Sequence, residues 1–260
     1  MNIIVCLKQV PDTNEVKIDP VTGTLIREGV PSIINPDDKN ALEEALALKD
    51  KYGANVAVVS MGPPQAEVAL REAFAMGADR AVLITDRAFA GADTLATSRA
   101  LAGAIEKMGD YDIVFAGRQA IDGDTAQVGP EIAEHLNLPQ ITYVEAVEPA
   151  ENGLRVKRAW EDGYENIKVQ TPVLLTAIKE LNVPRYMSVG HIFGAFDKEV
   201  EVWSAEYIGV DKSLLGLPGS PTKVKKSTTK EAKGKGAIVN LPPKEAAAEA
   251  VAKLKEKHYI

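Results

Sequence analysis

The stretch Asp112-Ile-Val-Phe-Ala-Gly-Arg-Gln-Ala-Ile-Asp-Gly-Asp-Thr-Ala-Gln-Val-Gly-Pro130 decides the fold that this sequence predicts. It opens with an apolar run at 113–116 that is typical of a buried strand, passes through a polar loop rich in glycine, and enters a helix-like segment at 131–138. A strand, a glycine loop and a helix start together direct unpaired backbone N–H groups at a bound anion. Thr125 and Gln127 add side-chain hydrogen-bonding groups. Because the loop matches neither GxGxxG nor a Walker A motif, an ordinary strand-to-helix connection is the alternative interpretation.

The chain before this stretch repeats the same alternation of strand and helix. Short, continuous apolar runs are expected of parallel strands that are covered on both faces, and they occur at 3–7, 56–60 and 81–85. Alanine-rich segments with helical spacing separate the strands, at 37–51, 64–76 and 94–108. The alternation predicts a doubly wound α/β fold with a mostly parallel sheet and right-handed crossovers.

After residue 138 the pattern becomes that of antiparallel strands. Polar and apolar residues alternate at 141–147, 154–160 and 166–169, with turns at Glu151-Asn-Gly153 and Glu161-Asp-Gly163. This pattern predicts a β-meander over residues 141–170. The apolar run at 172–178 predicts a strand that returns to the main sheet.

Regular signals become sparse beyond Pro184. Residues 216–236 are rich in proline, glycine and lysine, which predicts an extended linker. Residues 243–258 predict an amphipathic helix whose apolar face carries Ala247, Val251 and Leu254. The sequence leaves open whether a partner subunit or the chain's own domain covers that face.

Composition and charge narrow the class of protein. The 260 residues include 45% hydrophobic and 26% charged residues, as is ordinary for a soluble globular chain. A net charge of −7 argues against nucleic acid as a partner. Cys6 is the only cysteine, which excludes an intramolecular disulfide and a thiolate metal cage. No stretch approaches the roughly 18 apolar residues of a membrane span, and residues 1–6 indicate a core strand rather than a signal peptide. We therefore expect a cytoplasmic protein without a membrane partner.

Polar residues at the start of the first helix are candidate ligand contacts. Ligands of an open parallel sheet bind at the carboxyl ends of the strands. Asn35 fits an N-cap, Pro36 fits the first helical position, and Asp37 and Asp38 fit the first turn. Capping alone is the alternative role for Asn35.

The helix at 94–108 offers a second polar start. Asp93 fits its N-cap, which places Thr94 and Thr97 one turn apart on one face, where they could contact the polar rim of a ligand. The alternative is a local cap followed by back-bonded threonines.

The sequence predicts neither a catalytic residue nor a metal site. The three histidines, at 135, 191 and 258, are scattered and lack the spacing of metal ligands. No nucleophile elbow or serine–histidine pattern occurs. The chain therefore has the features of a protein that holds a nucleotide without acid–base machinery of its own.

Several segments together resemble the β subunits of the electron transfer flavoprotein family, and the resemblance covers essentially the whole chain. Residues 156–176 resemble the family signature over 21 positions. The other matching segments are 5–12, Asn35-Pro36 with 41–49, 73–80, and 182–186.

This resemblance implies an adenine-nucleotide α-hydrolase-like fold and a heterodimer with an α subunit that carries a redox FAD. In the common branch the β subunit holds a structural AMP. In the electron-bifurcating branch a second FAD takes a hydride from NADH. One electron then passes to the α-subunit FAD, which serves an acyl-CoA dehydrogenase, and the other passes to a low-potential acceptor such as ferredoxin or flavodoxin.

The resemblance also implies site residues and a domain division. Residues 1–184 would form the nucleotide-binding domain, and 185–260 would form a recognition loop and a C-terminal arm whose terminal helix docks on the partner subunit. We name residues 185–194 the recognition segment, with Val189 as its apolar anchor. The implied cofactor contacts, with the two threonines added, are Cys6, Asn35, Pro36, Asp37, Asp38, Met61, Thr94, Thr97, Asp122, Gly123, Asp124, Thr125, Ala126, Gln127, Val128, Gly129, Pro130, Glu131, Ile132 and Ala133.

The loop at 122–130 resembles the bifurcating branch. The common branch tends to place Asn before Gln127 and Gln at the position of Pro130. Thr94 and Thr97 lie further out than AMP alone would need, so FAD is favoured over AMP. Two further interpretations are a pure interaction protein with a vestigial site and an adenylating enzyme of related fold. The intact loop disfavours the first, and Lys8-Gln-Val-Pro11 lacks the pyrophosphate loop that the second needs.

Overall fold

The computed structural model describes residues 1–12, 31–224, 236 and 238–260. The chain forms two compact units, Met1–Lys225 and Lys226–Ile260. Most of the linker expected at 216–236 lies outside the described residues.

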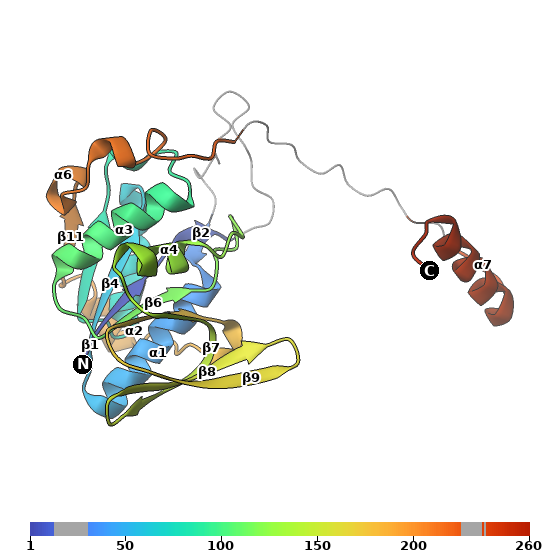
Figure 1. The fold of residues 1–260 in the computed structure, drawn as a ribbon, viewed down its shortest axis with the longest axis horizontal. Coiled ribbons are helices and arrows are strands. Elements are labelled where there is room, and N and C mark those ends of the chain that lie inside the picture. Colours follow the sequence, from blue (N-terminus) through green and yellow to red (C-terminus); the bar gives the residue numbers. More distant parts are fainter. Residues whose placement is uncertain (13–30, 225–235, 237) are drawn as a thin grey trace. The chain divides into compact units, whose positions relative to one another are not determined.

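The first unit is built on a twisted sheet in which the described residues contribute nine strands, in the order β11-β5-β4-β1-β6-β10-β7-β8-β9 (Figure 1). All neighbours from β11 to β7 pair in parallel, so the predicted doubly wound, mostly parallel sheet is confirmed. The strands are β1 (Asn2–Cys6), β4 (Asn55–Met61), β5 (Arg80–Ile84), β6 (Ile113–Gly117), β7 (Gln140–Ala150), β8 (Gly153–Trp160), β9 (Gly163–Val169), β10 (Val173–Ala177) and β11 (Val200–Trp203).

Helices cover both faces of this sheet and enclose two apolar layers (Figure 1). On one face α1 (Pro36–Tyr52) and α2 (Glu67–Met76) pack on the side of Phe115. On the other face α3 (Thr94–Met108) and α4 (Val128–His135) pack on the side of Val114. Successive residues of β6 thus point into opposite layers, as expected of a strand that is buried on both sides.

The predicted meander is present as a continuation of the main sheet. β7 pairs in parallel with β10 and antiparallel with β8, and β8 pairs antiparallel with β9. The register joins Ala150 to Gly153 and Trp160 to Gly163, so both predicted turns are two-residue connections. β10 returns between β6 and β7, as the apolar run predicted.

Other elements were not predicted. β2 (Gln9–Pro11) and β3 (Ser32–Ile34) form a small antiparallel pair. Beyond Pro184, where regular signals are sparse, the structure contains α5 (Val189–Gly194), β11 and α6 (Ala205–Ile208). These elements are four to six residues long, too short to show a period in sequence. Short 3-10 turns complete the unit: η1 (Pro64–Ala66), η2 (Arg87–Phe89), η3 (Lys179–Leu181) and η4 (Lys212–Leu214).

The first residues of the expected linker pack on the first unit instead. The Leu217 N–H donates to Ala90 O at 2.9 Å, and Ser220 Oγ accepts from the Asp93 N–H at 2.8 Å. Gly216 has a φ of 54°, and a Cβ there would lie 2.1 Å from Ala88 O. These contacts fix residues 216–222 against η2 and the start of α3, so an extended linker could begin only beyond them.

The second unit contains α7 (Pro243–Glu256), which matches the predicted terminal helix except for its last two residues. Taken by itself, α7 buries no residue. None of the helices that the structure describes has the length and apolar character of a membrane span.

Candidate functional site

The strand order reverses between β1 and β6, which defines the switch point of the sheet. Strands β4, β5 and β11 lie on the β1 side, whereas β10 and β7 lie on the β6 side. The carboxyl ends of two strands that diverge in this way frame a crevice for a ligand. The loops after β1 and β6 and the start of α1 meet at this point.

Asn35 joins the start of α1 to the loop after β6. It occupies the N-cap position, but its side chain makes no capping hydrogen bond. Its Nδ2 donates to Gln119 O at 2.8 Å, and its Oδ1 accepts from the Ile121 N–H at 3.0 Å. Asn35 is completely buried. The capping role is therefore wrong, because an amide that both donates and accepts is used to hold the loop.

Asp38 fastens the ends of β1 and β6 to each other. Its Oδ2 accepts from the Lys8 N–H at 2.7 Å and its Oδ1 from the Gly117 N–H at 3.0 Å. Burial raises the pKa of this carboxyl to about 7, although these hydrogen bonds and the Asn35 side chain oppose the rise. Gly117 permits the approach, since a Cβ there would lie 2.3 Å from Asp38 Oδ1.

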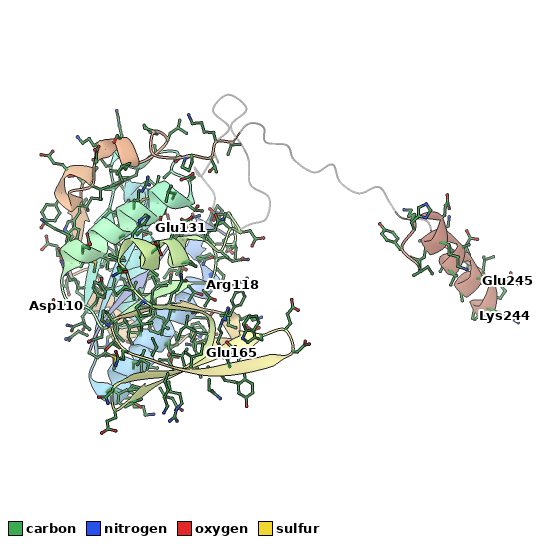
Figure 2. The ribbon with its side chains drawn as sticks, in the orientation of Figure 1. Asp110, Arg118, Glu131, Glu165, Lys244 and Glu245 are labelled. Atoms are coloured by element: carbon green, nitrogen blue, oxygen red, sulfur yellow. The ribbon has the colours of Figure 1, made fainter. Side chains whose placement is uncertain are left out.

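Charged side chains surround this junction. Lys8 Nζ lies 2.6 Å from Asp122 Oδ1, which ties the β1 loop to the β6 loop. Arg118, which is labelled in Figure 2, lies with its Nε 3.5 Å from Asp37 Oδ2 and its guanidinium carbon 5.8 Å from the centre of the Tyr143 ring. Burial raises the pKa of Asp37, and Arg118 partly offsets that rise. The sequence patterns assigned no role to Lys8 or Arg118, although Arg118 directly follows β6 and Lys8 comes two residues after β1.

The loop between β6 and α4 contains two residues in the left-handed region. Asp124 has a φ of 58° and Ala126 a φ of 54°. Aspartate tolerates this conformation, but alanine adopts it at a cost, which is typical of a loop whose shape serves a site. Gly123 is open, with nothing within 4 Å of the position that a Cβ would take. Thr125 and Gln127 are exposed.

The start of α4 is uncapped. Gln127 precedes the helix and makes no side-chain capping bond, so the N–H groups of the first turn are left for water or a ligand. Gly129 lies in this turn, and a Cβ there would meet Thr176 Cγ2 at 2.8 Å. The resemblance implied Gly129 as a cofactor contact, and that stays a prediction. The structure adds that a glycine here permits the close packing of α4 on β10.

The starts of α3 and α4 are brought together by Thr94. The Asp93 carboxylate caps α3 by accepting from the Ala96 N–H, as predicted. Thr94 Oγ1 lies 3.1 Å from both Gln127 Oε1 and Glu131 Oε1. The second carboxylate oxygen of Glu131 is buried and has no hydrogen-bond partner among the described residues (Figure 2). Thr97 lies one turn further along and is half-buried.

The remaining predicted contacts lie behind the site. Cys6 and Met61 belong to the apolar layer under α3 and α4. Burial, followed by the charge of Asp38, raises the pKa of the Cys6 thiol to about 12, so it is an unreactive packing group. Ile132 and Ala133 are completely buried, so their side chains are core residues and only their backbone could face a ligand. Pro36 occupies the first turn of α1, as predicted.

The recognition segment presents apolar side chains to solvent. Val189 is 72% exposed, Tyr186 99% and Phe193 74%. The segment contains α5, whose residues are all unburied and whose start is capped by Ser188. No group of histidine, cysteine and carboxylate side chains in the described residues is placed to hold a metal ion.

Comparison with known proteins places the chain in one family. The family model described as the electron transfer flavoprotein domain matches residues 22–207. The chain is 75% identical over 260 residues to an electron transfer flavoprotein subunit beta of Clostridium acetobutylicum. It is 57% identical over 262 residues to subunit CarD of the caffeyl-CoA reductase-Etf complex of Acetobacterium woodii, and 47% identical over 268 residues to the acryloyl-CoA reductase electron transfer subunit gamma of Anaerotignum propionicum. Each of these matches covers all of both chains. The chain therefore belongs to the electron transfer flavoprotein family, among its β subunits.

Proposed function

We propose that this chain is the β subunit of a heterodimeric electron transfer flavoprotein that binds FAD at the switch point of its sheet. With the α subunit it would oxidise NADH and divide the electrons. One electron would go to the α-subunit FAD and then to an acyl-CoA dehydrogenase, and the other to a low-potential acceptor such as ferredoxin or flavodoxin. The alternative is a β subunit whose site holds a structural AMP.

The residues at the switch point fit a dinucleotide. The uncapped start of α4 offers backbone N–H groups to a pyrophosphate. Lys8, which is paired with Asp122 in the loop that precedes α4, is a further hydrogen-bond donor at this edge of the sheet. The left-handed residues Asp124 and Ala126 give the loop the tight course that a phosphate cradle needs.

The cluster of Thr94, Gln127 and Glu131 is the observation that favours FAD over AMP. It joins α3 to α4 beyond the loop itself, and one buried carboxylate oxygen of Glu131 has no hydrogen-bond donor in the part of the chain that the structure describes. A carboxylate here would oppose a phosphate but would accept hydrogen bonds from the hydroxyl and N–H groups of a flavin.

Chemistry at this site would be that of the cofactor. Bound FAD would supply hydride acceptance and one-electron transfer, and the protein would supply binding, orientation and electrostatics. The names of the CarD and acryloyl-CoA reductase relatives support a partner that acts on an acyl-CoA thioester.

Cofactor content tests the proposal. The purified αβ heterodimer should release two FAD and no AMP on acid extraction. One FAD and one AMP would assign the chain to the AMP-binding branch. Thr94→Val keeps the shape of the side chain but removes its hydroxyl, and it should lower FAD retention in the β site after dialysis. Thr85→Val is the matched control, because Thr85 follows β5 and its N–H donates to Trp203 O at 3.0 Å, toward the β11 edge of the sheet.

The terminal helix gives a second test of the assembly. We propose that α7 covers its apolar face on the α subunit. The truncation is made after residue 225 so that the residues that pack on the first unit are kept: Leu215 is buried and Ser220 Oγ is hydrogen-bonded to the Asp93 N–H. Removal of residues 226–260 should weaken αβ association in analytical ultracentrifugation while circular dichroism of the first unit is retained. Association at wild-type strength would show that the helix packs on its own chain.

A further inference from the structure

The recognition segment is weakly packed. α5 lies against α2, but it has only six residues, which is well below the length at which a helix is stable in isolation, and none of them is buried. Even so, the segment presents Tyr186, Val189 and Phe193 close together in sequence as exposed apolar groups. Its conformation therefore depends on the contacts at its two ends as well as on α2.

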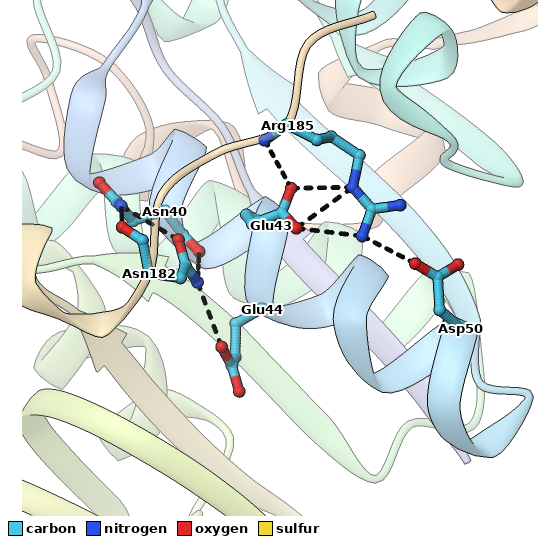
Figure 3. A network of polar contacts seen from close by, with 6 residues as sticks. All are labelled: Asn40, Glu43, Glu44, Asp50, Asn182 and Arg185. Atoms are coloured by element: carbon cyan, nitrogen blue, oxygen red, sulfur yellow. Dashed lines mark hydrogen bonds and ion pairs between the residues drawn. The ribbon is translucent and has the colours of Figure 1, made fainter. Parts of the chain in front are cut away.

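The first end is fastened to α1. Arg185 forms a fork with Glu43, with its Nη2 3.0 Å from Oε1 and its Nε 2.9 Å from Oε2, and its backbone N–H donates to the same carboxylate at 2.9 Å (Figure 3). Arg185 Nη2 also lies 2.9 Å from Asp50 Oδ2. Glu43 is 9% exposed, so this is a nearly buried, fully paired carboxylate. Such charge-assisted forks are strong and define one geometry.

A pair of asparagines extends this end. Asn40 Nδ2 donates to Asn182 O at 2.8 Å, and Asn182 Nδ2 donates to Asn40 O at 3.0 Å (Figure 3). Asn182 Nδ2 also donates to Glu44 Oε2 at 3.1 Å. Two side chains of α1, Asn40 and Glu43, thus bond to the backbone of residues 182–185, and Glu44 bonds to the Asn182 side chain.

The second end is fastened to α2. Arg71 Nη1 donates to Ala195 O at 2.8 Å and to Lys198 O at 3.3 Å, while Glu67 accepts from Nε and Nη2 of the same guanidinium. The guanidinium also lies 5.5 Å from the centre of the Phe196 ring. Lys198 Nζ donates to Ala78 O at 2.8 Å. The recognition segment therefore spans two arginine clamps, one on each helix of the same sheet face.

We propose that Arg185 with Glu43, and Arg71 with Glu67, are positioning residues that hold the recognition segment in its docking conformation before the dehydrogenase arrives. α5 cannot hold that conformation alone. The clamps order the segment before docking, so the binding free energy does not have to include the entropic cost of ordering it. The inference rests on the proposed function and on the role that the family resemblance implies for this segment, in which it docks on the acyl-CoA dehydrogenase with Val189 as its apolar anchor. Loss of a clamp lowers the competent fraction of the heterodimer, and the apparent affinity falls by that fraction.

The test compares clamp variants with a docking variant in the αβ heterodimer. Glu43→Gln keeps the shape of the side chain and removes the charge that the Arg185 fork needs. Glu148→Gln is the matched control, since Glu148 forms an exposed and loose pair with Arg155 at 3.9 Å. Val189→Ala tests docking itself. If Glu43→Gln fails to fold, Arg71→Lys is the second variant. It removes the guanidinium of the other clamp, at a side chain that is more exposed than Glu43.

Two measurements separate the outcomes. Hydrogen exchange of peptides over 183–198 should approach the rate of an unstructured peptide in each clamp variant, because a competent population near one tenth leaves the segment open most of the time. With a purified acyl-CoA dehydrogenase that accepts electrons from the wild-type heterodimer, the KM for the heterodimer should rise by about tenfold at that population. The maximal rate and the reduction of flavin by NADH should stay unchanged, because the docked complex is the same.

Each result bears on one claim. If Val189→Ala raises the KM but the loosened clamp variants do not, the clamp inference is wrong and the docking role stands. If neither Val189→Ala nor the clamp variants change the KM, the proposed docking role is wrong. If exchange over 183–198 does not quicken, the arginines are not clamps. A fall in maximal rate without a change in KM would also overturn the inference.

Discussion

The switch-point site and the recognition segment are both held by α1, but in different ways. At the switch point, Asn35 and Asp38 are buried and bond to the backbone of loops that follow β6 and β1. At the recognition segment, Glu43 and Asp50 hold only one end through Arg185, and the apolar middle stays exposed. The difference teaches that one helix can anchor both a buried polar junction, the proposed ligand site, and an exposed apolar segment, the proposed docking surface.

The two modes of attachment differ in how much stability is lost when they are removed. A buried polar group that loses its partner lowers the free energy of unfolding by its full desolvation penalty, about 1–3 kcal/mol for each group. Shortening an exposed apolar side chain changes the free energy of unfolding little. Changes at the switch point should therefore affect folding and cofactor together, whereas changes in the recognition segment should affect docking alone.

The largest effect is expected at Gly117, where α1 and β6 approach most closely. Gly117→Ala would place a Cβ 2.3 Å from Asp38 Oδ1 and 2.7 Å from the Asp38 backbone N. We expect a loss of about 3 kcal/mol in the free energy of unfolding, at the upper end for overpacking, with loss of β-site nucleotide. Urea denaturation measures the free energy of unfolding, and cofactor extraction measures the nucleotide content.

Gly123→Ala is the control for this change, because nothing lies within 4 Å of its Cβ position. It should change stability by less than about 0.5 kcal/mol. Equal stability losses in the two variants would show that the junction of α1 and β6 is not the tight point.

A smaller loss is expected from Asn35→Ala. The change leaves Gln119 O and the Ile121 N–H without their Asn35 partner in a partly buried setting, at a cost of about 1–2 kcal/mol in all. Asn55→Ala is the control, since the Asn55 side chain donates to Asn2 Oδ1 in an exposed hydrogen bond at the amino end of the sheet. Thermal unfolding should separate the two variants, and nucleotide should be lost only from the first. Retention of nucleotide by Asn35→Ala would remove this residue from the site.

Asp38 predicts a pH dependence. Its folded pKa of about 7 lies above its ordinary value of 3.8, so the folded state holds this proton more tightly than the unfolded state. Its contribution to stability is therefore greatest below about pH 4 and falls as the pH rises toward 7, by about 1.4 kcal/mol for each pKa unit of difference.

Asp38→Asn should flatten that slope. The free energy of unfolding, measured by urea denaturation from about pH 5 to pH 7.5, should change less with pH in the variant than in the wild type. Asp37 and Glu44, whose pKa values burial also raises, contribute equally to both proteins and cancel in the difference. Identical slopes would show that Asp38 does not titrate in this range.

The smallest effect on stability, with a clear effect on docking, is expected of Val189→Ala. Stability should change by less than about 0.5 kcal/mol, while electron transfer to the dehydrogenase should weaken by roughly 1 kcal/mol of docking free energy. Reduction by NADH should be unaffected. Val202→Ala, at a similarly exposed valine on β11, is the control. Parallel loss of both activities in Val189→Ala would contradict a docking role.

The sequence located the candidate site but not the contacts that build it. The strand, loop and helix start at 112–135 were predicted within a few residues, because each depends on neighbours along the chain. The bonds from Asn35 to Gln119 and Ile121 join residues 84 and 86 positions apart, and no local pattern indicates them. The same holds for Gly129, whose reason for being glycine is Thr176 on another strand.

By itself, the sequence determined the parallel strands, the meander turns, the terminal helix and the family, since these depend on local periodicity, turn residues and contiguous motifs. Only the tertiary structure decided that β10 lies between β6 and β7, that β11 extends the edge at β5, and that two arginines clamp the recognition segment. The physical reason is distance along the chain. Sheet order and long-range ion pairs arise when elements far apart in sequence pack together. The local sequence around each residue does not indicate which distant residue it will contact.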